Sequence, residues 1–356
     1  MPVSLPTPGG DSGQWGSKLN SYLRSVVLNI QDYGADPTGA TSATSAINNA
    51  INDAASIGAT VYIPQGTYMT TSAILMKSNV TLRGAGYNSL IRKGNYTNVF
   101  DVIRNAANDT LNIVIENLRI DGNIANNNDS VIHGGAGPQG GIDIPAGISE
   151  SLVQNVWVEN TGHTGIYLGG PRNKVINCVV KNVGKPGTTD LIGKSGIVAA
   201  ETGSPDVIIS GNYISNIAEH GIKIYNNANY NIVSDNRIEK CGERGIYTQV
   251  NSYLLIKGNT VIDSKPAGIF LEDTHYSTIT GNTCINNLRD QWGVGYGFLF
   301  TRCTNLTVNG NTAIKNVDYG IRMYLSSSCT LAGNVARENG TNIAYDGNTN
   351  GGGNII

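Results

Sequence analysis

The chain repeats a short turn signal, glycine or aspartate followed by asparagine, at nearly even intervals through its second half. The steps between successive asparagines are 24, 23, 23, 29 and 23 residues, a period too short for helix-pair repeats. A second series, glycine followed by a hydrophobic residue, keeps the same spacing. The two series are Asn212, Asn236, Asn259, Asn282, Asn311 and Asn334, and Gly141, Gly165, Gly196, Gly221, Gly245, Gly268, Gly297 and Gly320.

One period contains three short stretches of strand character. Residues 268–272 and 277–280 alternate apolar and polar side chains, and residues 260–262 follow the preceding Gly-Asn. Turn residues at 273–276, 281–282 and 263–266 separate the three stretches. Three strands per period, stacked in register, predict an all-β chain folded as a single-stranded parallel β-helix, in which equivalent strands lie roughly 4.8 Å apart. The recurrent asparagines are then expected to form a side-chain amide ladder.

The two ends of the array differ. Residues 42–57 place five apolar side chains at helical spacing, and Gly58 follows them, so a short helix is expected to cover the first coil. The five are Ala46, Ile47, Ala50, Ile51 and Ala54. We therefore predict a β-helix over 27–356, forming one cooperative unit. Residues 1–26 form a separate segment, in which Trp15, Leu19, Tyr22 and Leu23 would make an apolar stripe on a short helix. No capping segment is recognisable at the far end, so further chain or a partner is expected to cover it.

Composition narrows the classes of partner. Charged residues make up 14% of the chain and the net charge is −2 with no basic run, so neither nucleic acid nor an anionic membrane is an expected partner. No apolar stretch approaches the roughly 18 residues that span a bilayer, and the first residues do not read as a signal peptide. The five cysteines include no CxxC pair and are expected to be buried thiols. No aspartate-rich calcium motif occurs, so no cofactor is predicted, although calcium remains compatible with the sequence.

The beginning of the array resembles a known family. Asp32-Tyr33-Gly34-Ala35-Asp36, the expected helix, and Ile63-Pro64-x-Gly66-x-Tyr68 look like the opening module of pectate-lyase-like β-helix proteins, which include polygalacturonases, exo-acting lyases and phage tailspikes. Residues 5–23 resemble the N-terminal segment of phage tail proteins. The resemblance implies a right-handed helix, a long sugar polymer as ligand and often a homotrimer. It also implies attachment to other phage tail proteins through residues 1–26, with a location on the virion tail or outside the cell. The alternative for residues 1–26 is a simple arm that packs on this chain or on a neighbour.

The catalytic motifs of polygalacturonases are not found in the sequence. Asn-Thr-Asp, Gly-His-Gly and Arg-Ile-Lys do not occur, so plain pectin hydrolysis is not expected. No catalytic residue of the family can be assigned here by position, because fold alone does not determine chemistry. The candidate residues must therefore come from the repeat itself.

Three coils carry extra residues, at 122–140, 182–195 and 286–296. All three insertions fall between the strand after the asparagine turn and the Gly-Ile strand, so they emerge from one corner of the coil. Loops on one side of a repeat array often line its binding surface, although surface loops also tolerate insertions without function. We expect these loops to form one wall of a groove along the Gly-Ile strands.

The floor of that groove is the outward face of the Gly-Ile strands, where aromatic residues alternate with charged and amide residues. Aromatic rings pack on sugar C–H groups, while charged and amide groups bond hydroxyls or carboxylates. The alternative is that these side chains only stabilise the sheet by stacking between strands. The first outward row is Asp143, Tyr167, Val198, Lys223, Tyr247, Phe270, Leu299 and Arg322, and the second contains Tyr225, Gln249, Glu272 and Tyr324.

Charged residues and histidines gather at both rims of this face. Glu219-His220 and Glu243-Arg244 occupy equivalent places on consecutive coils, so the two carboxylates are expected about 5 Å apart. That separation suits a retaining glycosidase pair, and repulsion should raise the pKa of one carboxylate. The alternative for any one of these residues is that it is an ordinary charged residue in a solvent-exposed turn, without a role in catalysis. The opposite rim carries Glu201, Asp273 and His275, and His163 precedes Gly165.

Two enzymatic mechanisms and one non-enzymatic role fit these residues. A glycosidase would use two carboxylates from Glu219, Glu243, Glu272 and Asp273. A uronate lyase would need a cation and a base, drawn from Lys223, Arg244, Arg322, His220 and Tyr247. We therefore predict a tailspike-type protein that degrades a bacterial surface or acidic polysaccharide. The alternative is a tail protein or adhesin that binds glycan without cleaving it.

Overall fold

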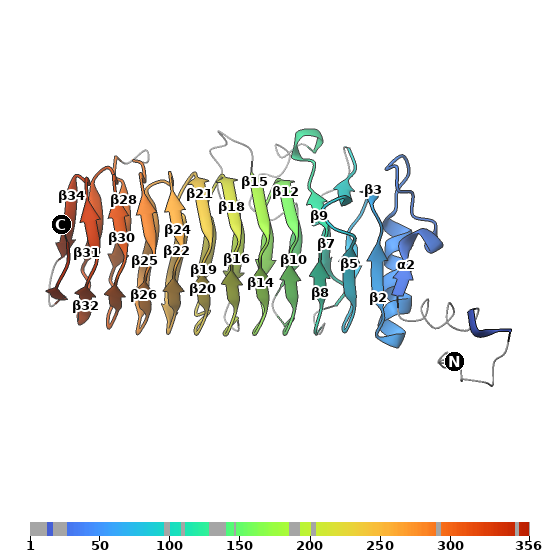
Figure 1. Cartoon of the computed structure of the whole chain (residues 1–356), viewed down its shortest axis with the longest axis horizontal. Coiled ribbons are helices and arrows are strands. Elements are labelled where there is room, and N and C mark those ends of the chain that lie inside the picture. The colour runs from blue at the N-terminus through green and yellow to red at the C-terminus, as the bar shows by residue number, and fades with distance from the viewer. Residues whose placement is uncertain are drawn as a thin grey trace.

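The computed structural model describes residues 13–16, 27–95, 100–107, 111–127, 140–145, 147–184, 193–200, 204–289, 293–345 and 349–355. Within these ranges the chain winds into stacked coils whose strands form three parallel sheets, with 13, 11 and 11 strands. The coils follow one another along a single axis from the N-terminal helix to the last strand (Figure 1). The predicted parallel β-helix is confirmed.

Sheet A pairs each of its strands with the strand one coil away. Its strands are β1 (Val27–Asn29), β2 (Thr60–Ile63), β5 (Thr81–Gly84), β8 (Val114–Glu116), β11 (Leu152–Gln154), β14 (Lys174–Ile176), β17 (Ile208–Ser210), β20 (Ile232–Ser234), β23 (Leu255–Lys257), β26 (Thr278–Thr280), β29 (Thr307–Asn309), β32 (Cys329–Ala332) and β35 (Thr349–Gly352). Sheet B follows each asparagine turn. Its strands are β3 (Gly66–Thr70), β6 (Ser89–Lys93), β9 (Arg119–Asp121), β12 (Trp157–Thr161), β15 (Val179–Val183), β18 (Tyr213–Ile217), β21 (Arg237–Cys241), β24 (Thr260–Ile262), β27 (Thr283–Ile285), β30 (Thr312–Ile314) and β33 (Val335–Arg337).

Sheet C contains the Gly-Ile strands. Its strands are β4 (Ile74–Met76), β7 (Ile103–Asn105), β10 (Ile142–Ile144), β13 (Ile166–Leu168), β16 (Ile197–Ala200), β19 (Ile222–Tyr225), β22 (Ile246–Ser252), β25 (Ala267–His275), β28 (Tyr296–Thr301), β31 (Tyr319–Tyr324) and β34 (Thr341–Tyr345). The helical elements are η1 (Ile30–Tyr33), α2 (Thr44–Ile57) and η2 (Ile124–Asn126).

The inward side chains of the three sheets stack into one apolar core. In the coil that runs through β24, β25 and β26, the predicted core residues Ile269, Leu271 and Ile279 are fully buried. The glycine before each Gly-Ile strand has a steric cause. A Cβ on Gly245 would lie 2.2 Å from Val261 Cγ1 and 2.6 Å from the Gly268 carbonyl oxygen, so no side chain fits there. The glycine series therefore marks the corner where sheet B meets sheet C.

The predicted asparagine ladder is present and buried. Asn311 shows its pattern: its backbone N–H and Nδ2 both donate to Asn334 Oδ1 at 3.0 Å, and Nδ2 also donates to the Ile279 carbonyl. Its own Oδ1 accepts the matching pair from Asn282. The same arrangement links Asn212 through Asn334 and ends on Asn354. Each coil is thereby held in register with the next.

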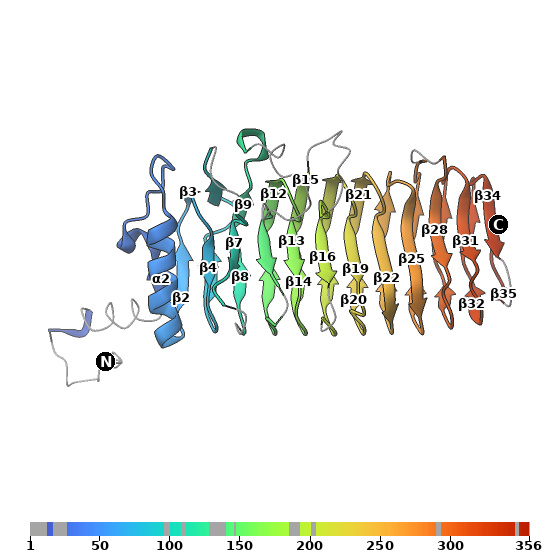
Figure 2. The same ribbon diagram turned by 180° about the vertical axis from the view of Figure 1, so that it is seen from behind.

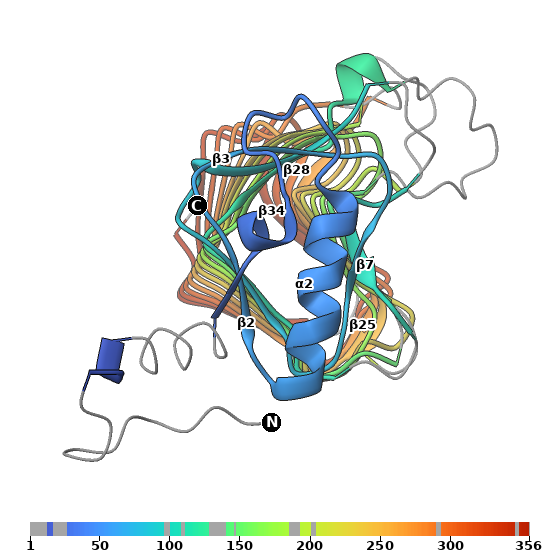
Figure 3. The ribbon, with the colours of Figure 1, turned by 90° about the vertical axis from the view of Figure 1, so that its right-hand side faces the viewer.

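Helix α2 lies across the N-terminal end of the stack, as Figure 3 shows along the axis. The predicted apolar face, Ala46, Ile47, Ala50, Ile51 and Ala54, is buried, and the helix ends at Gly58 in the left-handed region with φ of 66°. No helix among the described residues is long and apolar enough to cross a membrane. The stripe predicted from Trp15 to Leu23 lies outside the described residues except for Trp15 itself.

One predicted turn is wrong. Residues 273–275 belong to β25, which pairs in register with β22 as far as Ser252 and His275. Asp273 takes a left-handed conformation, φ 44°, but the strand continues beyond it because the neighbouring coil continues too. Sheet C is therefore wider in these coils than the sequence predicted.

The three insertions join sheet B to sheet C, between β9 and β10, β15 and β16, and β27 and β28, as predicted. Residues 128–139, 185–192 and 290–292 of these loops lie outside the described residues, so a wall beside sheet C stays a prediction. All five cysteines are buried and free, as expected.

The asparagine ladder predicts that two neighbouring Asn→Ala variants differ in their free energy of unfolding. Changing Asn311→Ala strips the buried Asn282 amide donors of their acceptor, so the free energy of unfolding should fall by about 2–4 kcal/mol. The exposed Asn309, two residues earlier, is the control. Asn309→Ala should change the free energy of unfolding by less than about 0.5 kcal/mol. Urea titration followed by circular dichroism measures both. Equal losses in the two variants would mean that the ladder does not hold the coils together.

Candidate functional site

The outward rows predicted for sheet C are confirmed by the strand register. Lys223, Tyr247 and Phe270 are direct partners across β19, β22 and β25, and Leu299 and Arg322 continue the row on β28 and β31. Figure 2 shows these strands side by side. Because register fixes which side chains are neighbours, any chemistry on this face depends on contacts between consecutive coils.

The two predicted rim carboxylates meet around one histidine. His220 Nε2 lies 3.5 Å from Glu219 Oε1 and 3.4 Å from Glu243 Oε2. These carboxylate and imidazole atoms all lie within 4.8 Å of one another. The sequence predicted that Glu219 and Glu243 would be close, but the imidazole between them was not foreseen.

Glu219 is held by four groups from two coils. Its Oε2 accepts hydrogen bonds from the Ser195 hydroxyl at 2.6 Å and the Lys194 backbone N–H at 3.1 Å. Its Oε1 accepts from Lys223 Nζ at 3.0 Å and lies beside His220. A buried carboxylate with this many donors is fixed in place, so Glu219 is suited to orient His220.

Glu243 is the more open carboxylate of the pair. Its side chain is 24% exposed, against 7% for Glu219, and Arg244 Nη1 donates to it at 2.9 Å. The Arg244 guanidinium lies over the rings of Tyr247 and Phe270, at 4.6 and 5.0 Å from their centroids. Its Nε is buried with no hydrogen-bond partner, so this guanidinium has a donor left over.

His220 is neutral in this setting. Burial, and then the positive charges of Arg244 and Lys223, hold the pKa of the imidazole well below its usual range. The Arg244 backbone N–H lies 3.4 Å from Nδ1 and donates to it, which assigns the remaining proton to Nε2, facing the two carboxylates. The imidazole thus presents an N–H to Glu243, and its ring packs against Tyr247.

A second group of charges continues across the same face. Tyr247 Oη donates to Glu272 Oε2 at 2.7 Å, and Gln249 Nε2 donates to the same oxygen at 3.3 Å. Burial and this bond to Glu272 raise the pKa of Tyr247. Arg302 then bridges Glu272, at 2.6 Å, and Asp273, at 2.8 Å, and its hydrogen bonds lower the pKa of Asp273. The predicted catalytic residues on both rims therefore belong to one chain of contacts.

The predicted role of two aromatic residues is wrong. Tyr247 and Phe270 point outward as expected, but they are only 7% and 8% exposed. Arg244 lies over both rings, and Tyr296 and Leu299 pack against them from the following coil. These rings support the guanidinium and do not offer open faces to a sugar.

The remaining predicted binding residues are spread along the helix. Lys223 Nζ lies 5.1 Å from the Tyr225 ring, and His275 Nδ1 bonds to the Thr304 hydroxyl at 2.9 Å on the far edge of sheet C. Arg322 lies over Tyr319 and Tyr324, toward the C-terminal end. Asp143 on β10 and Tyr167 on β13 are direct partners in the sheet. His163 lies at the rim, one coil before Lys194 and two coils before Glu219. Lys223 belongs to the cluster around His220 through its bond to Glu219, and Glu201 lies outside the described residues.

Among the described residues, one group could offer metal ligands: Glu219, His220 and Glu243. Two observations argue against a divalent cation there. The imidazole proton is assigned to Nε2, the atom that would have to bind the metal, and Lys223 and Arg244 already neutralise both carboxylates. This donor set suits proton transfer better than metal binding.

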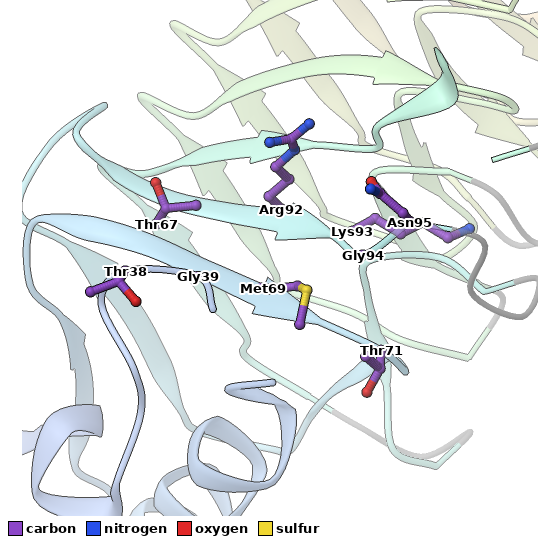
Figure 4. Close-up of a pocket in the computed structure, with 9 residues that line it drawn as sticks. All are labelled: Thr38, Gly39, Thr67, Met69, Thr71, Arg92, Lys93, Gly94 and Asn95. Carbon is purple, nitrogen blue, oxygen red and sulfur yellow. The ribbon is translucent and has the colours of Figure 1, made fainter. Parts of the chain in front are cut away.

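An open cavity lies elsewhere. It has a volume of about 380 Å³ and is lined by β3, β6 and residues near the capping helix (Figure 4). Lys93 turns away from Arg92 in this view, and its Nζ donates to the Phe100 carbonyl at 3.3 Å. The cavity is on sheet B near the N-terminal end and shares no residue with the cluster.

Arg302 and Ser195 are the site residues that the sequence analysis missed. Arg302 stands one coil after Asp273 at the equivalent position, and Ser195 one coil before His220. Aligning the coils residue by residue would have placed both beside predicted carboxylates. Their partners depend on side-chain direction, which the spacing alone does not give.

Comparison with known proteins supports the fold. Residues 27–247, more than half of the chain, match the family model "Rhamnogalacturonase A/epimerase, pectate lyase-like", and residues 188–336 match "Right handed beta helix region", which gives the predicted hand. The mannuronan C5-epimerase AlgE3 of Azotobacter vinelandii is 28% identical over 263 residues, which is 67% of this chain but only 13% of that protein. This chain therefore spans a small part of the relative.

Two further matches are shorter or more distant. Alginate lyase 7 of Azotobacter vinelandii is 36% identical over 107 residues, 27% of this chain and 12% of that protein. The pre-mature gene product 12 of bacteriophage phi29 superposes with a TM-score of 0.73 at 18% identity, covering 90% of this chain and 47% of the other. At that identity the superposition shows a shared fold and nothing more.

Because His220 is neutral in the folded chain, we expect the free energy of unfolding to fall on acidification. The unfolded chain takes up a proton on this imidazole below about pH 6.5 and the folded chain does not, so stability falls as pH drops. The expected loss approaches roughly 1 kcal/mol per pH unit below about pH 6. Urea unfolding at several pH values measures how the free energy of unfolding depends on pH. His220→Gln should remove this dependence. His275→Gln changes a half-buried histidine at the far edge of sheet C and should keep it. A wild-type protein that becomes more stable on acidification would contradict the neutral state.

Proposed function

This chain belongs to the rhamnogalacturonase A/epimerase, pectate lyase-like family, and we propose that it removes the proton α to a uronate carboxylate in an acidic polysaccharide. The reaction class is that of a polyuronate lyase or C5-epimerase. The observation that carries the proposal is the cluster at the start of β19 and β22, where two cations and two carboxylates surround a neutral imidazole.

Each group in the cluster has a role in that reaction. Lys223 and Arg244, each with a side chain 22% exposed, would bind the sugar carboxylate and neutralise it, which acidifies the neighbouring C–H. Glu243, the open carboxylate, would accept the C5 proton. His220 and Glu219 are positioning residues: the buried Nε2–H of the imidazole faces both Glu243 and Glu219, and the Ser195 hydroxyl holds Glu219 in place.

The step leaves one intermediate with two outcomes. When Glu243 takes the C5 proton, the bonding electron pair moves into the sugar carboxylate, where the cations stabilise it. Return of a proton to the other face of C5 completes epimerisation. Alternatively that electron pair forms a C4–C5 double bond while the C4–O4 bond breaks. O4 leaves with the C4–O4 bonding pair and takes up a proton from water, so the chain is cleaved, which is a lyase reaction. Both outcomes need the same cations and base.

The geometry favours proton removal over retaining hydrolysis. A retaining pair must leave room for a sugar between its carboxylates, roughly 5 Å apart. Here the imidazole of His220 lies between Glu219 and Glu243 and contacts both. Glu219 is also buried and fully bonded, which suits orientation and not attack on a sugar.

The relatives suggest where to look for the substrate. The matched proteins are named for mannuronan epimerisation and alginate cleavage, so polymannuronate and alginate are the first polymers to test. The tailspike role, the homotrimer, the virion or extracellular location and the attachment segment at 1–26 stay predictions from the sequence.

Binding without catalysis is the second candidate function. The specific observation in its favour is that the described acidic groups of the site already have cationic partners: Lys223, Arg244 and Arg302. A surface of satisfied charges can hold a glycan by exchanging bonds with its hydroxyls and carboxylates. A tail protein or adhesin on this fold would need no more than that.

Proton removal can be tested directly. Incubating polymannuronate or alginate with the protein in D2O should place deuterium at C5 of an epimerised sugar, detected by NMR, or should produce the ultraviolet absorbance of an unsaturated uronate, whose C5 carries no hydrogen. Glu243→Gln should lower the rate of deuterium uptake or of double-bond formation by a factor of about 100 or more, because the base is lost. Glu338→Gln, an exposed carboxylate near the C-terminal end, is the control and should keep the wild-type rate.

The contrary results separate the alternatives. Shorter chains with neither an unsaturated uronate nor deuterium at C5 would indicate a hydrolase. Binding without exchange or cleavage would leave the glycan-binding function. Full exchange in Glu243→Gln would assign the base to another residue.

A further inference from the structure

Three tyrosines form an exposed stack at the edge of sheet C that is remote from the cluster. Tyr230, Tyr253 and Tyr276 occupy equivalent places on consecutive coils and are 54%, 47% and 57% exposed. The Tyr230 and Tyr253 rings lie 4.8 Å apart at 3°, and the Tyr253 and Tyr276 rings 5.5 Å apart at 16°. The stack is a narrow aromatic strip on the surface, running along the axis of the helix.

The backbone at these positions does not call for aromatic residues. All three tyrosines have left-handed conformations, with φ of 60°, 60° and 50°, which disfavour bulky side chains. The next coil places Asn305 at the same position with φ of 56°, and asparagine tolerates this conformation well. The turn could therefore be made at lower conformational cost by asparagine throughout, and stacking alone is a weak reason to keep three rings in water.

The stack lies on the same coils as the candidate site. Tyr230, Tyr253 and Tyr276 follow β19, β22 and β25, the strands that carry Lys223, Tyr247 and Glu272. Partly or fully exposed polar side chains occupy the face between the cluster and the stack. They are Gln249, Glu272, Asp273, His275 and Arg302. About eight strand residues separate Arg244 from Tyr253, a path of roughly 25 Å, which is long enough for several sugar units.

We propose that the tyrosine stack is a distal subsite for a polysaccharide that crosses sheet C from the cluster toward sheet A. The proposal rests on the function proposed above, since the reacting sugar would lie at Glu243. Sugar units further along the chain would pass over the polar residues and place their C–H groups against the exposed edges of the stacked rings and the outer faces of Tyr230 and Tyr276. The stack would then select for long polymers and take no part in the proton transfer.

A sugar chain fits this strip better than a protein does. Stable protein interfaces bury about 800 Å² on each partner, and the stack is only one residue wide, bordered by the polar side chains of His275 and Thr304. A polymer that crosses the strip can place the C–H groups of one or two sugar units on the rings and their hydroxyls on the bordering polar side chains.

The test removes the rings and keeps the backbone. A triple variant, Tyr230→Asn, Tyr253→Asn and Tyr276→Asn, uses the residue found at the same place in the next coil. Tyr345→Asn, an exposed tyrosine at the C-terminal end of sheet C, is the matched control. The triple variant and the control are each combined with Glu243→Gln, so that the protein does not convert the sugars during the measurement. The protein with Glu243→Gln alone is the reference. Calorimetry then gives the affinity for short and long oligomannuronates and for a panel of neutral polysaccharides.

The expected result is a length-dependent loss. The triple variant should bind long oligomers about tenfold more weakly than the reference, as expected for lost aromatic contacts, and trimers equally well. The control should bind both like the reference. Equal affinity for long oligomers in the triple variant and the reference would overturn the subsite.

The same experiment separates this inference from the proposed function. If the reference binds only neutral polymers and the triple variant loses that binding, the subsite stands and the uronate reaction falls. If no glycan binds, both fall. A changed oligomeric state of the triple variant in light scattering, with unchanged sugar binding, would make the stack a contact between copies of the chain and overturn the proposal.

Discussion

The buried hydrogen bonds between consecutive coils are the constraint on which the rest of this structure depends. Each ladder asparagine gives two donors to the next ladder asparagine and receives two from the previous one. An unpaired amide in the core would cost free energy, so a slip of one coil against another is strongly disfavoured. The glycine column adds a steric condition, because a Cβ at Gly245 would meet the neighbouring backbone. Together they fix the height and rotation of every coil.

Fixed register is also what creates the candidate site. Glu219 and Glu243 belong to different coils, and their only reason to meet is that the coils repeat in register. The same holds for Glu272 and Arg302, which come together across β25 and β28. Chemistry on a β-helix thus needs no special loop or hinge: substitutions at repeated outward positions suffice. A residue substituted at an outward position lies one strand spacing from the equivalent residue of the next coil. This fixed distance gives the preorganisation that proton transfer needs.

Sequence periodicity predicted the parts that repetition determines. The core residues, the asparagine ladder, the capping helix and the outward rows all follow from period and alternation, and the structure has them. The proximity of Glu219 and Glu243 followed in the same way. Periodicity could not show which way a long side chain turns. Arg244 folds over Tyr247 and Phe270, so the rings expected to be open are covered.

Other differences have the same origin. Residues 273–275 contain turn-forming types, yet they stay in β25 because the neighbouring coil supplies a pairing partner. A second amide ladder, Asn287 to Asn316 to Asn339, escaped notice because no glycine or aspartate marks its positions. Contacts between coils decide both features, and a single repeat read alone does not contain them.

The most direct test of the central claim, that the face around Glu243 holds the reacting sugar, is a crystal structure of Glu243→Gln with a bound oligomannuronate. The account predicts one sugar carboxylate on Lys223 or Arg244, with the C5 hydrogen of that sugar facing residue 243. An oligosaccharide bound along sheet A or sheet B, with none on the outer face of sheet C, would contradict it.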